Sequence, residues 1–432
     1  MVLGLGISGR AAARFAAAHD ASLVLTDTRV DIARDGLPQG EIHLGAESEA
    51  WLHGVDLVIA SPGVPPKSAL LRAARASAIP VIGELELASQ FITAPMVAVT
   101  GTNGKSTVTM LAGEILKAAG MKTFVGGNLG TPLIEAAQSE FDAIVVEVSS
   151  YQLETIATFK PKVAIHLNLS EDHLDRYRDL DKYGRAKARI FENQDQSDWA
   201  IVNRDDPEVR KLAGNLRSRV FSFGTSLSAK NPAIWFESGD LVFDDGRRRG
   251  RISLDDFKLP GRHNLSNAMA AAAAALALDV DPLVIERAFA HFAGLPHRTE
   301  FVYEKDGVAF IDDSKGTNVG AVIEALAGVR GPVILIAGGT DKGGDYAPLR
   351  APLKEKVRLL ILIGAAREKM RKALEGATTI APLPTLSEAV KLAASEARRG
   401  DSVLLSPACS SFDQFKDYAE RGRIFQELVR AL

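Results

Sequence analysis

The sequence lacks the features that define several common classes of protein. It has a single cysteine, Cys409, so an internal disulfide is excluded and no cysteine pair is present for a structural zinc site. Its 51 basic and 54 acidic residues leave a net charge of −3, without the basic excess of a nucleic-acid coat. Its most apolar helical stretch, residues 268–278, is much shorter than the roughly 20 residues that cross a bilayer. The first ten residues, MVLGLGISGR, do not resemble a signal peptide. We therefore expect a cytoplasmic protein that binds neither membrane nor nucleic acid.

Short β-branched runs alternate with helical patterns along most of the 432 residues, which is typical of βα units around parallel sheets. We predict an α/β fold with three domains. Residues 1–83 form a Rossmann-like domain, residues 84–294 a central domain with a mostly parallel sheet and a small β-rich part, and residues 295–432 a second Rossmann-like domain. The arginine-rich turn at 247–251 is flanked by aspartates, which favours a solvated hairpin over a nucleic-acid patch.

The strongest chemical signal is MVAVTGTNGKST at residues 96–107, an apolar strand followed by a glycine loop and a helix. Backbone amides at a helix N-terminus bind phosphate, and Lys105 adds a positive charge. Ser106 or Thr107 offers a hydroxyl to Mg²⁺. Val99 stands where the generic phosphate-loop pattern has glycine, so this loop is a shorter variant.

Two acidic or imidazole side chains follow neighbouring apolar runs of the same βα series. Glu147 lies near the end of the run 143–148, and His173 lies just beyond the run 163–168. Parallel strands present functional residues at their carboxyl ends. Each residue alone fits an ordinary loop position, but together, after a phosphate loop, they are candidate neighbours of Mg²⁺.

The N-terminal GLGISG (residues 4–9) matches G-x-G-x-x-G, and Asp27 follows the apolar run 23–26. The motif fits a dinucleotide, but any nucleotide pyrophosphate satisfies the same geometry. No feature of the sequence demands a hydride-transfer site.

In the predicted third domain, residues 295–432, three polar loops follow strands: DDSKGTN (312–318), GGTDKGG (338–344) and SPACSS (406–411). Loops at the carboxyl ends of strands in one sheet converge on one crevice. The first loop fits a carboxylate site and, equally well, an ordinary helix N-cap made by Ser314 or Thr317. Cys409 has no identifiable base, which favours a packed thiol. Composition alone predicts a solvated Lys187.

Seven motifs in order carry a resemblance to a known family: TGTNGKS (100–106), EVSSYQL (147–153), SEDHLDR (170–176), Lys187 in its helix, GRHNLSN (261–267), LPHR (295–298) and DSKGTN (313–318). The set resembles that of the Mur ligase family over essentially the whole chain. The resemblance implies that the first domain binds a UDP substrate, that the middle one is a phosphate-loop ATPase domain, and that the third binds an amino acid.

The resemblance also implies the site residues. It assigns to the UDP sugar Ile7, Ser8, Asp27, Thr28, Arg29 and Gly63, and to the muramoyl side Asn128 and His173. It assigns to ATP Gly101, Thr102, Asn103, Gly104, Lys105, Ser106, Thr107, Asn264, Asn267, Arg298 and Asp313. It assigns to D-glutamate Lys315, Thr317, Lys342, Ser411 and the backbone at Tyr418. Two Mg²⁺ ions are held by Ser106, Glu147, His173 and a Lys187 carbamylated by CO₂, and the catalytic set is Lys105, Glu147, His173, Lys187 and His297.

The implied reaction is ATP-dependent addition of D-glutamate to UDP-N-acetylmuramoyl-L-alanine through an acyl phosphate, by a monomer. A sister ligase with another acceptor, or a folylpolyglutamate synthetase, is the alternative within this class. Outside it, a phosphate-loop NTPase switch or a nicotinamide dehydrogenase built on residues 4–9 stays open.

Overall fold

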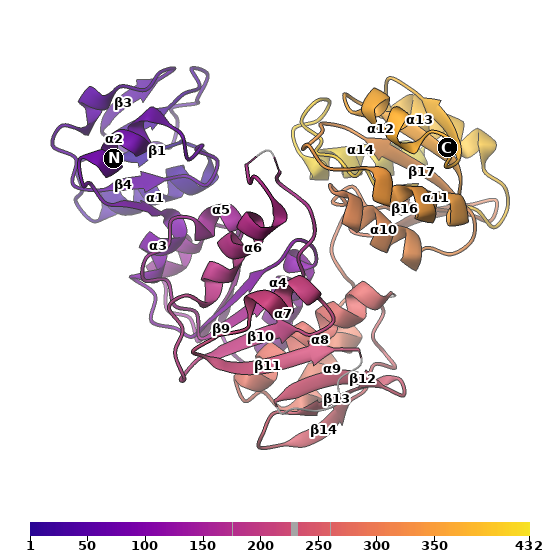
Figure 1. Cartoon of the computed structure of the whole chain (residues 1–432), viewed down its shortest axis with the longest axis horizontal. Helices are drawn as coiled ribbons and strands as arrows, with labels where there is room; N and C mark the ends of the chain where they lie inside the picture. Colours follow the sequence, from indigo (N-terminus) through magenta and orange to yellow (C-terminus); the bar gives the residue numbers. More distant parts are fainter. Residues whose placement is uncertain (175, 226–231, 260) are drawn as a thin grey trace. The chain divides into compact units, whose positions relative to one another are not determined.

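The computed structural model describes residues 1–174, 176–225, 232–259 and 261–432 (Figure 1). The chain forms two compact units. The first comprises Met1–Leu169, Gly184–Phe257 and Ser266–His291, and the second comprises Ser170–Tyr183, Lys258–Leu265 and Phe292–Leu432. The first unit contains two sheets and the second contains one, and each sheet is mostly parallel with helices around it. The predicted α/β class is therefore confirmed.

The first sheet is fully parallel, with strand order β3-β2-β1-β4-β5. Its elements are β1 (Val2–Leu3), α1 (Ile7–Ala18), β2 (Val24–Asp27), β3 (Glu41–Leu44), η1 (Glu49–Leu52), β4 (Val58–Ala60), α2 (Ala69–Ala76) and β5 (Val81–Gly83). The glycine pattern is explained by a close approach, because a Cβ on Gly9 would lie 1.9 Å from the carbonyl oxygen of Gly4. The edge strand β3 was not predicted, since its half-exposed sequence EIHL has no apolar run.

The second sheet has nine strands in the order β14-β13-β12-β11-β10-β9-β6-β8-β7. Its strands are β6 (Met96–Thr100), β7 (Thr123–Gly127), β8 (Ala143–Glu147), β9 (Val163–His166), β10 (Trp199–Asn203), β11 (Arg219–Gly224), β12 (Ala233–Glu237), β13 (Asp240–Asp244) and β14 (Arg249–Ile252). The pairs β12–β13 and β13–β14 are antiparallel, so the predicted β-rich part extends the same sheet. Arg247 in the turn is exposed and pairs with Asp279, as expected for a solvated hairpin.

Helices accompany this sheet along the chain. They are α3 (Glu84–Ser89), α4 (Lys105–Ala118), η2 (Leu133–Gln138), α5 (Ser150–Leu153), α6 (Leu180–Ala188), η3 (Arg189–Phe191), α7 (Pro207–Leu212), α8 (Arg262–Ala277) and α9 (Pro282–His291). The alanine run of α8 is completely buried. The apolar stretch of the sequence is therefore buried within the fold. No helix within the described ranges is long and apolar enough to cross a bilayer.

The third sheet has the order β15-β16-β20-β17-β18-β19 and is parallel except for the pair β15–β16. Its elements are β15 (Glu300–Lys305), β16 (Val308–Asp312), α10 (Val319–Gly328), β17 (Val333–Gly338), η4 (Ala347–Leu349), α11 (Arg350–Lys356), β18 (Val357–Ile363), α12 (Arg367–Leu374), β19 (Thr379–Pro382), α13 (Leu386–Glu396), β20 (Ser402–Leu405) and α14 (Tyr418–Arg430). Each face of the sheet carries its own apolar core. The polar loops that follow β16, β17 and β20 therefore share one edge, as predicted.

Candidate functional site

The glycine loop joins the end of β6 to the start of α4. Gly101 and Gly104 have φ angles of 148° and 86°, which L side chains rarely adopt, so the loop requires glycine at both positions. The Lys105 ammonium donates hydrogen bonds to the carbonyl oxygens of Gly101 (2.9 Å) and Thr102 (2.8 Å). This folds the lysine back over a loop whose backbone amides begin a helix, which is the geometry of an anion site.

Three polar side chains meet beside this loop. The Ser106 hydroxyl donates to Glu147 Oε2 (2.6 Å), and Asn128 Nδ2 donates to Glu147 Oε1 (2.7 Å). Ser106 and Glu147 are buried, and β8 pairs with β6 so that Glu147 stands opposite Val99. A hydroxyl and a carboxylate are hard oxygen donors of the kind that Mg²⁺ prefers.

Asn168 is a loop residue that the sequence did not single out. Its side chain accepts from the backbone N–H of Asn103 (2.8 Å) and donates to the Asn103 carbonyl (3.0 Å), while its own carbonyl accepts from Thr102 N–H (3.0 Å). Asn168 therefore clamps the phosphate loop from the end of β9. The only sequence signal was its place directly after an apolar strand.

The Lys187 side chain is buried, although composition predicts a solvated lysine. Only 1% of its surface is exposed, and its ammonium donates to the Gly101 carbonyl oxygen (2.7 Å), so the prediction of a solvated lysine is wrong. The helix α6 is polar on average, but it turns this one side chain toward the phosphate loop. Its neighbours Arg185 and Arg189 lie at other helix positions with different exposure.

The residues assigned to adenine and ribose fall into two groups. Asn267 belongs with the phosphate loop, since a Cβ on Gly104 would lie 2.3 Å from Asn267 Oδ1. Asp313 lies in the second unit, accepts from Ser406 Oγ (2.6 Å) and interacts with the charge of Arg298. Burial raises the pKa of Asp313 to about 6, although Arg298 and the hydrogen bonds oppose the shift. Asn264 is a buried residue of α8.

A cavity of about 650 Å³ lies at the carboxyl edge of the first sheet. All six residues assigned to the UDP sugar line it: Ile7, Ser8, Asp27, Thr28, Arg29 and Gly63. Asp27 accepts from the Leu5 backbone N–H (2.8 Å) and pairs with Arg29 (2.9 Å). Burial by itself would raise the pKa of Asp27, but the hydrogen bonds from Arg29 and Leu5 outweigh it and lower this pKa to about 2.

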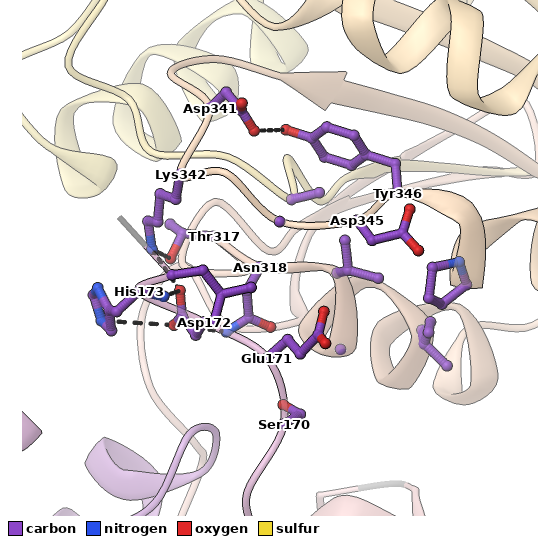
Figure 2. A pocket seen from close by; sticks show the side chains of 17 residues that line it. Ser170, Glu171, Asp172, His173, Thr317, Asn318, Asp341, Lys342, Asp345 and Tyr346 are labelled. Carbon is purple, nitrogen blue, oxygen red and sulfur yellow. Dashed lines mark hydrogen bonds and ion pairs between the residues drawn. The ribbon is translucent and has the colours of Figure 1, made fainter. Parts of the chain in front are cut away.

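A second cavity, of about 220 Å³, lies within the second unit, and Figure 2 shows its lining. Lys342 approaches Thr317 Oγ1 (3.3 Å) and Asp172 Oδ1 (3.5 Å), so the loops after β16 and β17 do converge. His173 also lines this cavity, with Nε2 at 3.7 Å from Asp172 Oδ2, and it belongs to a different unit from Glu147 and Lys187.

The remaining residues assigned to D-glutamate lie on the same loops of the third sheet. Lys315 Nζ stands 5.1 Å from the centre of the Tyr418 ring, and Ser411 is buried.

The helix α10 is capped by Asn318, whose side chain accepts from Ala321 N–H (2.9 Å), so the alternative of a cap by Ser314 or Thr317 is wrong.

Arg421 of α14 ties these loops together and was missed by the sequence. It is 1% exposed and donates to Ser314 and to the carbonyl oxygens of Cys409 and Ser410. Cys409 itself is buried, and burial raises the pKa of its thiol to about 11, which agrees with a packed thiol.

His297, predicted to be catalytic, has its Nδ1 at 2.6 Å from the buried Asp312 Oδ2. Gln426 of α14 donates to the same Asp312 oxygen (3.0 Å) and to Glu300 Oε2 (3.1 Å). His297, Glu300 and Asp312 are close enough for a shared cation, but the histidine and glutamine already engage these carboxylates. The arrangement holds the loop before β15 on α14.

A variant phosphate loop, an acidic oxygen cluster beside it and polar strand-end loops on two further α/β sheets define a multidomain phosphate-loop protein. Models of three domains match the chain: the MurD-like N-terminal domain of Mur ligases at residues 1–83, the Mur ligase middle domain at 99–275 and the Mur ligase glutamate ligase domain at 297–409. The chain belongs to the Mur ligase family.

Curated relatives match over the full length. The UDP-N-acetylmuramoylalanine–D-glutamate ligases of Geotalea uraniireducens and Geotalea daltonii are 47% and 48% identical, covering 100% of this chain and 97% of each relative. Among solved structures, a pseudomurein peptide ligase type C from Methanothermus fervidus aligns with a TM-score of 0.65 at 20% identity, covering 100% of this chain and 99% of that one. The UDP-N-acetylmuramate–alanine ligase of Thermotoga maritima aligns at 0.62 and 19%, covering 100% and 98%. These structures confirm the fold.

Proposed function

We propose that this protein is an ATP-dependent ligase that joins D-glutamate to UDP-N-acetylmuramoyl-L-alanine in peptidoglycan precursor synthesis. The observation that carries the proposal is the full-length identity of 45–48% to ligases of that name. The phosphate loop and its oxygen cluster supply the chemistry that such a ligase needs. We also propose that the chain divides into domains at 83/84 and 294/295 and works as a cytoplasmic monomer.

A carboxylate does not accept an amine at neutral pH, because oxide is a poor leaving group. In the proposed first step, an oxygen of the L-alanyl carboxylate attacks the γ-phosphorus of ATP, the bond to the β–γ bridging oxygen breaks, and ADP leaves. In the second step, the D-glutamate amine attacks the acyl carbon, loses a proton and expels phosphate. Lys105 and the backbone amides at the start of α4 stabilise the charge that develops on the phosphoryl oxygens.

The donors beside the loop fit Mg²⁺. Ser106 and Glu147 present buried oxygens that already lie 2.6 Å apart, and the resemblance adds His173 and a carbamylated Lys187 for a second ion. When bound, Mg²⁺ neutralises phosphate charge. In carbamylation, the neutral Lys187 amine attacks the carbon of CO₂, one C=O π pair moves to oxygen, and the nitrogen releases one proton. Keeping an ammonium away from water is costly, so a buried lysine fits this modification.

Each of the other two sheets takes one substrate in this proposal. The cavity lined by Ile7, Asp27 and Arg29 binds the UDP sugar, and Asn128 meets the muramoyl side. The loops with Lys315, Thr317 and Lys342, together with Ser411 and Tyr418, bind D-glutamate. Asn264, Asn267, Arg298 and Asp313 surround the adenosine of ATP, and His297 supports the catalytic loop that carries Arg298.

Phosphate release tests the function directly. The purified protein is given ATP, Mg²⁺ and UDP-N-acetylmuramoyl-L-alanine with, in turn, D-glutamate, L-glutamate, glycine, lysine or diaminopimelate. We expect release only when the UDP substrate and D-glutamate are both present. Release with another amino acid would identify a sister ligase, and release without either substrate would identify an NTPase switch.

A further inference from the structure

His166, the last residue of β9, is a buried histidine that the mechanism does not use. None of its surface is exposed, and neither ring nitrogen has a hydrogen-bond partner among the described residues. Burial disfavours a charged imidazole here, and the ring keeps at least one N–H donor in either protonation state. A neutral imidazole carries one N–H donor and one acceptor. Buried polar groups without partners are rare in folded proteins and call for an explanation.

The surroundings of His166 point to the missing partner. In the sheet, His166 pairs with Thr100, the residue before Gly101, and the Gly101 carbonyl accepts from the Lys187 ammonium (2.7 Å). The His166 ring also lies 6.4 Å, centre to centre, from the ring of Phe191, four residues after Lys187. The ring therefore faces the helical segment that carries Lys187, next to the carbonyl that this lysine contacts.

We propose that His166 is a positioning residue that donates its ring N–H to a carbamate oxygen on Lys187. The inference rests on the proposed function, because it needs the carbamate. Carbamylation replaces a buried cation by an anion with two acceptor oxygens, which gives His166 the partner that it lacks. The hydrogen bond stabilises the modified lysine and fixes the orientation of its carbamate next to the phosphate loop, where the Gly101 carbonyl lies.

The test measures the carbamate itself. The full-length protein is titrated with ¹³C-bicarbonate, and the carbamate carbon is followed by NMR, with Lys187→Met to assign the resonance. We expect His166→Leu to need roughly tenfold more bicarbonate for half-saturation, since a hydrogen bond to a charged group is lost. His166→Asn keeps an amide donor and should lie between the two. Thr109→Val removes a buried hydroxyl that, like the His166 ring, has no hydrogen-bond partner among the described residues, and it should titrate like the parent protein.

Thermal unfolding without bicarbonate separates positioning from a structural role. His166→Leu replaces ring nitrogens that lack hydrogen-bond partners within the described ranges by an apolar side chain, so its midpoint should equal or exceed that of the parent protein. Equal bicarbonate titrations of the parent, His166→Leu and His166→Asn would overturn the role of His166 alone. The absence of any carbamate resonance in the parent protein would overturn the proposed carbamate and this inference with it, while ligase activity in the phosphate assay would still stand.

Discussion

The carbonyl oxygen of Gly101 receives two lysines from different parts of the chain. Lys105 reaches it from the start of α4 at 2.9 Å, and Lys187 reaches it from α6 at 2.7 Å. The Gly101 carbonyl thus contacts both the lysine that is proposed to act on the ATP phosphates and the lysine that is proposed to carry the carbamate.

Lys105→Ala should abolish ligation while leaving the fold intact, because the lysine acts on phosphate charge and is not part of an apolar core. We expect a rate loss of about 10² or more, the usual cost of removing such an electrostatic group. The matched control is Lys117→Ala at the exposed end of the same helix, where the lysine pairs only with Glu114 in the described contacts and should keep nearly full turnover. Turnover of Lys105→Ala equal to that of the control would remove Lys105 from the mechanism.

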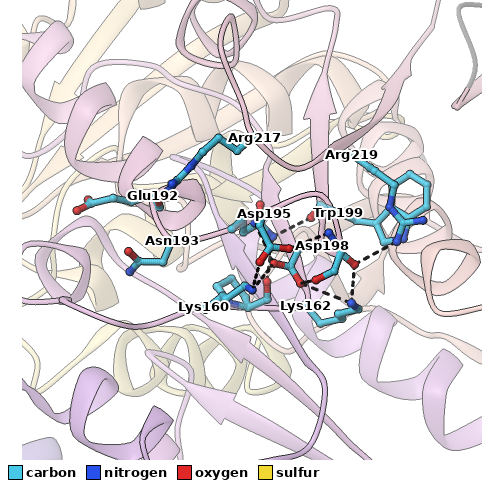
Figure 3. A network of polar contacts seen from close by, with 12 residues as sticks. Lys160, Lys162, Glu192, Asn193, Asp195, Asp198, Trp199, Arg217 and Arg219 are labelled. Atoms are coloured by element: carbon cyan, nitrogen blue, oxygen red, sulfur yellow. Dashed lines mark hydrogen bonds and ion pairs between the residues drawn. The ribbon is translucent and has the colours of Figure 1, made fainter.

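Among the elements, the starts of β9, β10 and β11 carry a polar network at the edge of the sheet opposite the phosphate loop (Figure 3). Asp198 is 3% exposed and lies within 3.3 Å of Lys160 and 3.5 Å of Lys162. Asp195 is exposed and contacts Lys160 from the solvent side. Burial therefore distinguishes two carboxylates that share one cation.

Asp198→Ala should lower the free energy of unfolding by about 2 kcal/mol, because two cations and a backbone N–H lose a buried acceptor. Thermal unfolding should show a midpoint several degrees lower. Asp195→Ala is the matched control, and its midpoint should hardly change. Activity per folded molecule should stay unchanged in both. Equal midpoints for the two variants would mean that the network does not stabilise this edge.

The helix α3 carries a buried acid, Glu84, whose Oε1 accepts from Ile134 N–H (2.7 Å). Burial, helped by the charge of Glu135, raises the pKa of Glu84 to about 7. The pKa of Glu84 in the folded protein exceeds its ordinary value of 4.5, so the protonated carboxyl contributes stability that is fully present below about pH 4.5. This contribution is lost as the pH rises through 7 and the buried carboxyl ionises.

Glu84→Gln mimics the protonated form and should become more stable than the parent protein as the pH rises. The gain between pH 5 and pH 8 should be about 2–3 kcal/mol in the free energy of unfolding. Urea denaturation of both proteins at the two pH values measures it. A stability difference that is independent of pH would show that Glu84 titrates normally in the folded protein.

At the scale of the whole molecule, three sheets carry three polar edges, and each edge is proposed to bind a different reactant. Asp27→Asn should raise KM for the UDP substrate several-fold, because it weakens the hold on Arg29 in the first cavity. Lys342→Ala should instead raise KM for D-glutamate by about tenfold, through loss of a charge-assisted hydrogen bond. Steady-state kinetics with each substrate varied in turn separates them, and each variant controls for the other. Equal effects on both substrates would contradict the separation of sites.

Much of the architecture follows from local pattern. The phosphate loop, Glu147 and the polar loops after β16, β17 and β20 all lie at the carboxyl ends of strands, as the periodicity predicts, because a parallel strand puts its next loop at one edge. The strands β3, β15 and β19 escaped prediction, since edge strands are half-exposed and lack an apolar run. Asn168 and Arg421 also escaped, because their partners are far away in the sequence.

The sequence by itself determined the α/β class, the position of the phosphate loop and the family, since these depend on residue types at short spacing. Only the tertiary structure decided that Lys187 is buried against Gly101, that Asn318 caps α10, and that His166 lies near the segment of Lys187 without a hydrogen-bond partner in the described part of the chain. Burial and pairing are set by the segments that the fold brings together. A polar helix such as α6 does not reveal in its own residues which lysine will face the core.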